Sequence, residues 1–124
     1  MTRGGEGARP VNACLFPLYA AEGASVTTVE GLGGGPRPPH PLQAALAAAH
    51  GSQCGFCTPG FVVAAAGALC ARAAGRPPPS VADVEDLLAG NLCRCTGYRP
   101  IVDALRPWLE GGGEGVGCAP DRGG

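Results

Sequence analysis

The sequence predicts a mainly α-helical domain, a small four-helix bundle preceded by a short β-rich piece. After residue 41, apolar stretches bounded by proline, serine or glycine recur four times, each long enough for two or more helical turns. Residues 11–29 instead contain β-branched residues and turn formers. Aromatic residues make up only 5% of the chain, which also has 22 glycines and 13 prolines. We therefore expect a thin core built mainly from alanine, valine and leucine.

Each of the four expected helices has recognisable end signals. They span residues 42–49, 59–74, 81–89 and 100–109. Gly51 is a natural left-handed stop for the first helix, and Pro59 lies in the first turn of the second, which Gly75 follows. Ser80 opens the third helix with a variant of the capping box, and Gly90 ends it.

The amino-terminal part reads as two strands. Residues 11–19 resemble a strand leaving a turn, residues 25–29 form a second β-rich run, and residues 31–39 form a linker punctuated by proline and glycine. Two isolated strands bury little surface, so we expect this part to be the edge of a sheet domain. A hairpin packed against the helices is the alternative.

Charge and cysteine usage point to a soluble, cytoplasmic protein. Nine basic residues, all arginine, balance ten acidic ones, which predicts neither nucleic-acid nor membrane binding. Seven cysteines do not pair evenly into disulfides, and Met1 is followed by polar, glycine-rich residues rather than by a secretory leader. The most apolar stretch, residues 61–74, contains Arg72 and is too short to cross a bilayer.

Four cysteines form two tight pairs that carry the chemistry of the chain. Cys54 and Cys57 precede the second expected helix, whereas Cys93 and Cys95 precede the fourth. Four thiolates are the ligand set of iron–sulfur clusters and of closed zinc sites. Two helix N-termini aimed at one point would suit a negatively charged cluster, because their free N–H groups can bond to sulfur.

Other uses of these thiols fit the spacing less well. Zinc sites usually combine two C-x2-C pairs at closer spacing, whereas here the second pair is C-x-C and about 35 residues separate the halves. A thioredoxin-like redox pair needs a strand before its first cysteine, and buried structural thiols would not form two matched pairs. Spacing alone therefore favours iron–sulfur and leaves zinc open.

The remaining candidates stand outside these pairs. Cys70 lies among alanines in an expected helix and reads as a small apolar residue, and Cys118 reads as an incidental thiol in the tail. Cys14, on an expected strand, would suit the distant fourth cysteine of a plant-type ferredoxin, but no preceding triplet accompanies it. Gln53 either caps a helix or contacts a cofactor.

Two blocks of this sequence, residues 50–60 and 90–101, closely resemble the molybdenum hydroxylase family, whose members include xanthine dehydrogenase and aldehyde oxidase. Residues 11–15 and 27–33 are similar to the end of the ferredoxin-like domain of that family. The resemblance covers roughly residues 10–109, and the cysteine blocks are its most specific part. It favours iron–sulfur strongly over zinc.

The resemblance implies a role for each candidate residue. In that family two [2Fe–2S] clusters relay electrons from a molybdopterin centre towards FAD. By similarity, the ligands of the cluster nearer molybdenum would be Cys54, Cys57, Cys93 and Cys95. Cys95 and Gln53 would face the pterin, and Cys14 would match the last ligand of the other cluster.

The resemblance also implies a division of the chain. Residues 1–35 would be an incomplete ferredoxin-like (β-grasp) piece with its linker, residues 36–110 the helical [2Fe–2S]-binding domain, and residues 111–124 a disordered glycine-rich tail. The FAD and molybdenum domains are not in this sequence. We therefore expect an electron-transfer part that is not catalytic on its own and works with those domains or subunits. The alternatives are a zinc-stabilised docking module and a truncated product without function.

Overall fold

The four expected helices form the body of the molecule. The computed structural model describes residues 1–3, 8–77 and 80–112. In chain order its main helices are α2 (Pro41–Ala48), α3 (Thr58–Ala73), α4 (Val81–Ala89) and α5 (Arg99–Pro107). The prediction of a mainly helical fold is confirmed, and every predicted helix boundary lies within two residues of the observed one.

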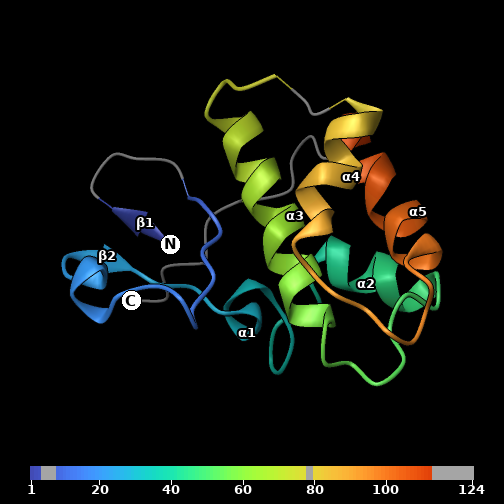
Figure 1. Cartoon of the computed structure of the whole chain (residues 1–124), viewed down its shortest axis with the longest axis horizontal. Helices are drawn as coiled ribbons and strands as arrows, with labels where there is room; N and C mark the ends of the chain where they lie inside the picture. Colours follow the sequence, from blue (N-terminus) through green and yellow to red (C-terminus); the bar gives the residue numbers. More distant parts are fainter. Residues whose placement is uncertain (4–7, 78–79, 113–124) are drawn as a thin grey trace.

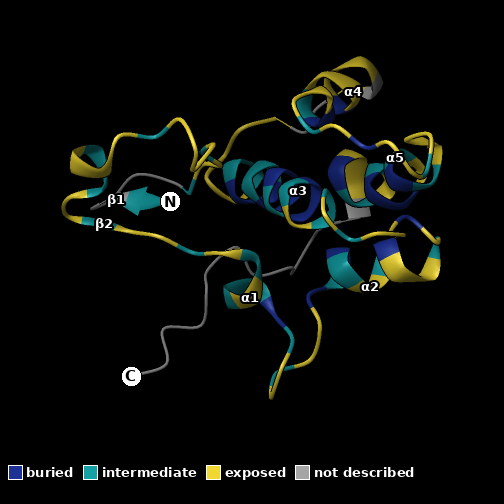
Figure 2. Ribbon diagram, turned by 60° about the horizontal axis from the view of Figure 1, so that its bottom comes forward, coloured by how far each residue is buried: buried dark blue, intermediate teal, exposed yellow. Residues whose placement is uncertain are grey.

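The helices pack as a closed ring around a small core. α2 packs against α3 and α5, and α4 packs against the same two helices. Figure 1 shows α3 as the longest element, at the centre of the molecule. The largest fully buried side chains are those of Phe61, Leu42, Leu46, Ile101, Leu105, Leu109, Val62 and Val84. Figure 2 shows the buried residues on the facing sides of the helices.

Two helices begin at capping boxes. Ser80 Oγ accepts the N–H of Asp83 at 3.3 Å, and Asp83 Oδ2 accepts the N–H of Ser80 at 2.8 Å, which confirms the predicted start of α4. At α2, His40 Nδ1 accepts the N–H of Leu42 at 3.3 Å, and Gln43 Oε1 accepts the N–H of His40 at 2.7 Å. These contacts satisfy N–H groups that the helix itself leaves free.

The end of α2 differs in detail from the prediction. The left-handed residue is His50, with a φ of 53°, and not Gly51. Gly51 instead approaches the helix closely, because a Cβ there would lie 2.8 Å from Leu46 Cδ2. A larger residue at position 51 would require the buried Leu46 side chain to shift, so glycine fits here because of space rather than because of its backbone angle.

The predicted strands of the amino-terminal part are largely wrong. Residues 11–19 form turns that lead into a 3-10 helix, Leu18–Ala21. The side chains of Leu15 and Leu18 are 81% and 88% exposed, so a strand here would bury neither face. Of the run 25–29, only Ser25 belongs to a strand, and Val29 opens a short helix, α1 (Val29–Leu32).

A two-residue ladder is what remains of the β-rich piece. β1 (Thr2–Arg3) pairs antiparallel with β2 (Ala24–Ser25), in the register Thr2 to Ser25 and Arg3 to Ala24. Figure 1 places this ladder on the opposite side of α3 from α5. A ladder this short contributes little stability by itself.

The carboxyl-terminal end of the described chain continues α5. Trp108–Gly112 forms a π-helical turn, and Leu109 within it is fully buried. The glycine-rich segment at residues 4–7, most of the predicted tail at 111–124 and Cys118 lie outside the described residues. In the described part of the chain, no helix combines the length and hydropathy needed to cross a bilayer.

Candidate metal centre

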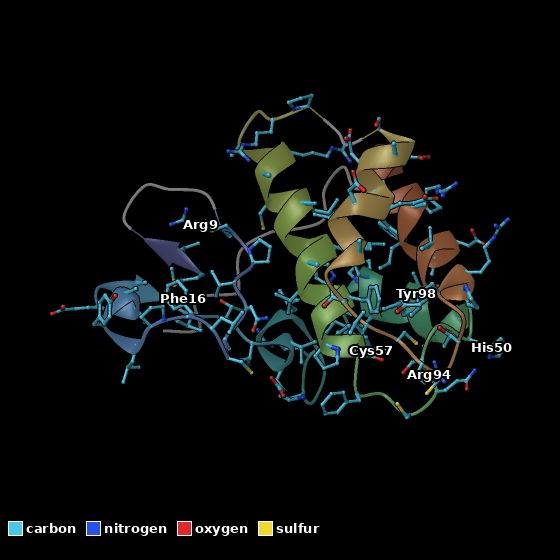
Figure 3. The ribbon with its side chains drawn as sticks, in the orientation of Figure 1. Arg9, Phe16, His50, Cys57, Arg94 and Tyr98 are labelled. Carbon is cyan, nitrogen blue, oxygen red and sulfur yellow. The ribbon has the colours of Figure 1, made fainter. Side chains whose placement is uncertain are left out.

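Two loops meet at one end of the helical bundle. One connects α2 to α3 and carries Cys54 and Cys57, and the other connects α4 to α5 and carries Cys93 and Cys95. Asn91 of the second loop lies against Gly60, just after the first loop, and Figure 3 shows Cys57 and Arg94 on the opposite side of α3 from Phe16. The fold therefore brings together two motifs that are far apart in sequence.

The four thiols form two pairs, each of which spans the two loops. The Cys95 side chain lowers the pKa of Cys54, and the Cys57 side chain lowers the pKa of Cys93, so each pair interacts across the two loops. Cys54 and Cys95 are exposed, Cys57 is half-buried, and Cys93 is only 8% exposed. The site thus has an inner pair next to the core and an outer pair open to the surface.

The inner pair contains one thiol that favours its charged form. Thr96 Oγ1 lies 3.1 Å from Cys93 Sγ, and the Thr96 N–H donates to the same sulfur at 3.5 Å. The side-chain hydrogen bond from Thr96 is the main reason that the pKa of Cys93 falls to about 7. Burial is the main reason that the pKa of its partner Cys57 is raised.

In the outer pair, too, one thiol has a lowered pKa and the other a raised pKa. A hydrogen bond from the Phe56 N–H is the main cause that lowers the pKa of Cys54, and the S–H of Cys95 adds to it. The interaction with the Cys54 side chain is the main cause that raises the pKa of Cys95. One member of each pair is therefore inclined to be a thiolate, which is the form that binds metal.

A strained turn fixes the loop before α5. Gly97 and Tyr98 have φ angles of 72° and 67°, and the second value is unusual for a residue with a side chain. The Cys93 N–H donates to the Tyr98 hydroxyl oxygen at 3.0 Å. The Tyr98 ring also meets Phe61 edge to face, with centroids 6.4 Å apart. Tyr98 thus connects the loop of Cys93 to the core.

Close packing holds the two loops against each other. A Cβ at Gly60, in the first turn of α3, would collide with the side-chain oxygen of Asn91 in the other loop. Within the first loop, the hydroxyl oxygens of Ser52 and Thr58 lie 2.8 Å apart. Glycine at position 60 lets the second loop approach the start of α3.

The donor set fits a two-iron cluster. All four donors are sulfur, which is the soft ligand type of iron–sulfur clusters and of thiolate zinc sites. Within the described residues, no three His, Cys, Asp or Glu side chains form a group that could hold a metal ion. Tetrahedral zinc needs its ligands around one centre, whereas a [2Fe–2S] cluster shares four thiolates between two irons. The two pairs of cysteines supply the four thiols that either kind of site would use.

The other candidate residues lie apart from the four thiols or only beside them. Gln53 is exposed next to Cys54, and Cys70 is buried in α3. Cys14 is exposed in the amino-terminal part, two residues before Phe16, which Figure 3 shows far from the metal centre. The structure does not bring Cys14 to the four thiols.

Sequence reasoning missed the contacts that Thr96 and Tyr98 make with Cys93. The sequence marks them only as part of a helix start, but both touch Cys93. A usable signal was present, since a threonine three residues after a possible acceptor commonly bonds back to it. The contact of Tyr98 was not predictable in this way, because it requires the unusual backbone angle.

The lowered pKa of Cys93 predicts a pH dependence of stability in the metal-free chain. Its pKa falls from 9.0 to about 7 on folding, so between these values the folded chain holds fewer protons than the unfolded chain. Stability should therefore rise as the pH increases from 7 towards 9, and be lost as the pH falls through 7. Urea titrations across this range measure the effect.

The matched variant is Cys93→Ser, which should reduce the rise because serine does not titrate there, while the lowered pKa of Cys54 leaves a smaller rise. The raised pKa of Cys57 changes the stability only above pH 9.0, so Cys57 does not affect the rise between pH 7 and 9. A rise of equal size in Cys93→Ser would contradict the assignment to Cys93.

Comparison with known proteins identifies relatives of this region. A family described as "[2Fe-2S] binding domain" matches residues 28–106. Xanthine dehydrogenase of Oryza sativa subsp. japonica is 58% identical over 96 residues, which are 77% of this chain and 7% of that protein. Aldehyde oxidase of Homo sapiens is 45% identical over 119 residues, which are 92% of this chain and 9% of that protein. The chain therefore spans less than a tenth of the length of either relative.

A solved structure supports the same grouping. The quinoline 2-oxidoreductase of Pseudomonas putida 86 superposes with a TM-score of 0.65 at 44% sequence identity. The match covers 77% of this chain and 56% of that one.

Proposed function

Because the chain belongs to the family of [2Fe–2S] binding domains, we propose that Cys54, Cys57, Cys93 and Cys95 are the ligands of one [2Fe–2S] cluster. The observation that carries this proposal is the close approach of the two loops that hold these cysteines, where Asn91 of one loop packs against Gly60 beside the other. One member of each pair has a lowered pKa, so that two of the four ligands deprotonate readily.

We propose that the chain transfers single electrons inside a molybdenum hydroxylase similar to xanthine dehydrogenase or aldehyde oxidase. Electrons would pass from a molybdopterin centre towards FAD, both carried by other domains or partner chains. The similarity to the two relatives supports this role. When bound, the cluster supplies one-electron transfer without bond making at the protein. We assign no catalytic residue to this chain, and we place the enzyme in the cytoplasm, where thiols stay reduced.

Two exposed residues indicate which side of the domain would face the molybdopterin partner. Cys95 and Gln53 are exposed on the same end of the bundle, so both are available to a partner. We propose that they face the pterin, with Gln53 anchoring it through its side-chain amide. The inner pair lies against the core and holds the cluster in place.

The domain division of the chain follows as part of the same proposal. Residues 36–110 would be the cluster-binding unit, since the buried core runs from Leu42 to Leu109. Residues 1–35 would be the end of a ferredoxin-like domain whose remaining ligands lie on another segment or chain. Cys14 would then be a ligand of the second cluster only within that larger assembly.

The experiment that tests the proposal is reconstitution of the full chain with iron and sulfide under anaerobic conditions. We expect about two irons per chain, visible absorption and an EPR signal on reduction with dithionite. A colourless chain that binds zinc would replace the proposal by a structural or docking module. A chain that binds neither metal would indicate a product without function.

A further inference from the structure

One of the four sulfurs, that of Cys93, has two hydrogen-bonding groups from the same nearby residue, Thr96. Cys93 Sγ lies 3.1 Å from Thr96 Oγ1 and 3.5 Å from the Thr96 backbone nitrogen. The Tyr98 N–H in turn donates to Thr96 Oγ1 at 3.3 Å. These contacts form a short series of hydrogen bonds that ends on the sulfur of Cys93.

The protonation state of Cys93 decides which atoms donate in this series of hydrogen bonds. A sulfur that binds iron is a thiolate, so it can only accept, and the hydroxyl hydrogen of Thr96 must point to it. The lone pair of that hydroxyl is used by the Tyr98 N–H. Such a relay strengthens the final hydrogen bond, because each donor polarises the next.

The other threonine in the equivalent sequence position behaves differently. Thr58 follows Cys57 directly, as Thr96 follows Cys95. The Thr58 hydroxyl lies 2.8 Å from the Ser52 hydroxyl, and no hydrogen bond from it to a sulfur occurs among the described residues. The two cysteine pairs look alike in sequence, but only the second has a hydroxyl directed at a sulfur.

We propose that Thr96 is a positioning residue that raises the reduction potential of the cluster through its hydrogen bond to Cys93. This inference rests on the proposed function. Reduction adds one negative charge to the cluster and its sulfurs. A donor held on a sulfur therefore stabilises the reduced form more than the oxidised one. The strained turn at Tyr98 is what keeps the relay in place.

The test is a redox titration of the reconstituted full chain, followed by EPR, for four proteins: the unchanged chain, Thr96→Val, Thr96→Ser and Thr58→Val. Valine keeps the shape and the backbone N–H of Thr96 but removes the hydroxyl. We expect the ratio of reduced to oxidised cluster in Thr96→Val to fall about tenfold at a fixed ambient potential, which is 59 mV for a one-electron couple. Thr96→Ser should restore the original potential, and Thr58→Val should leave it unchanged.

The possible results distinguish an effect of Thr96 on the reduction potential from a purely structural role. Equal potentials in Thr96→Val and in the unchanged chain would overturn the inference while leaving the cluster proposal intact. Equal downward shifts in Thr96→Val and Thr58→Val would also overturn it, since the effect would not depend on the contact with sulfur. If Thr96→Val fails to assemble a cluster, Thr96→Ala is titrated instead, and failure of both would assign Thr96 a structural role only. An unchanged chain without a cluster would overturn the proposed function itself.

Discussion

Replacing Cys93 by alanine is expected to abolish the visible absorption of the reconstituted chain and to reduce its iron content to near zero. Cys93 is the most buried of the four thiols, and its pKa is lowered to about 7. Alanine leaves three sulfurs where a [2Fe–2S] cluster needs four. Iron and sulfide analysis, together with the visible spectrum, measures the loss.

Cys70→Ala is the matched control, because it also removes a buried thiol from the helical bundle. Cys70 lies in the middle of α3, away from the two loops, so its loss should leave iron content and spectrum unchanged. A full cluster in Cys93→Ala would contradict the ligand assignment. Equal loss in both variants would show that the effect arises from the fold rather than from ligation.

Replacing Phe61 by alanine is expected to lower the free energy of unfolding by about 3–5 kcal/mol. Phe61 is 1% exposed in the first half of α3, and its ring packs edge to face against Tyr98. Truncation would leave a cavity in a core that has few aromatic residues. Because small domains are stable by only about 5–15 kcal/mol, this loss is a large part of the total. Urea unfolding of the metal-free chain, followed by circular dichroism, measures it.

Phe56→Ala provides the same chemical change at an exposed site. The Phe56 side chain is 95% exposed in the loop between Cys54 and Cys57. Its truncation should change stability by no more than about 0.5 kcal/mol. Comparable losses in the two variants would mean that Phe61 is not part of the core. Tyr98 adds a further test, since its turn should become less ordered when the Phe61 ring is removed.

The helices were predictable because their signals are local. Proline at the start of α3, the serine cap of α4 and the glycines after the helices act within a few residues of chain. The strand predictions failed because a strand depends on contacts with distant parts of the chain. A strand at residues 11–19 needs a partner and a covered face, and the structure gives its leucines neither.

The sequence by itself determined the four helices and the position of the two cysteine pairs just before α3 and α5. Only the tertiary structure decided how those thiols pair, that Cys93 is buried while Cys95 is exposed, and that Thr96 rather than Thr58 bonds to a sulfur. The two loops are far apart in sequence, and their approach depends on helix packing and on the contact between Gly60 and Asn91. Such contacts arise from the packing of the whole domain, and no pattern within one segment records them.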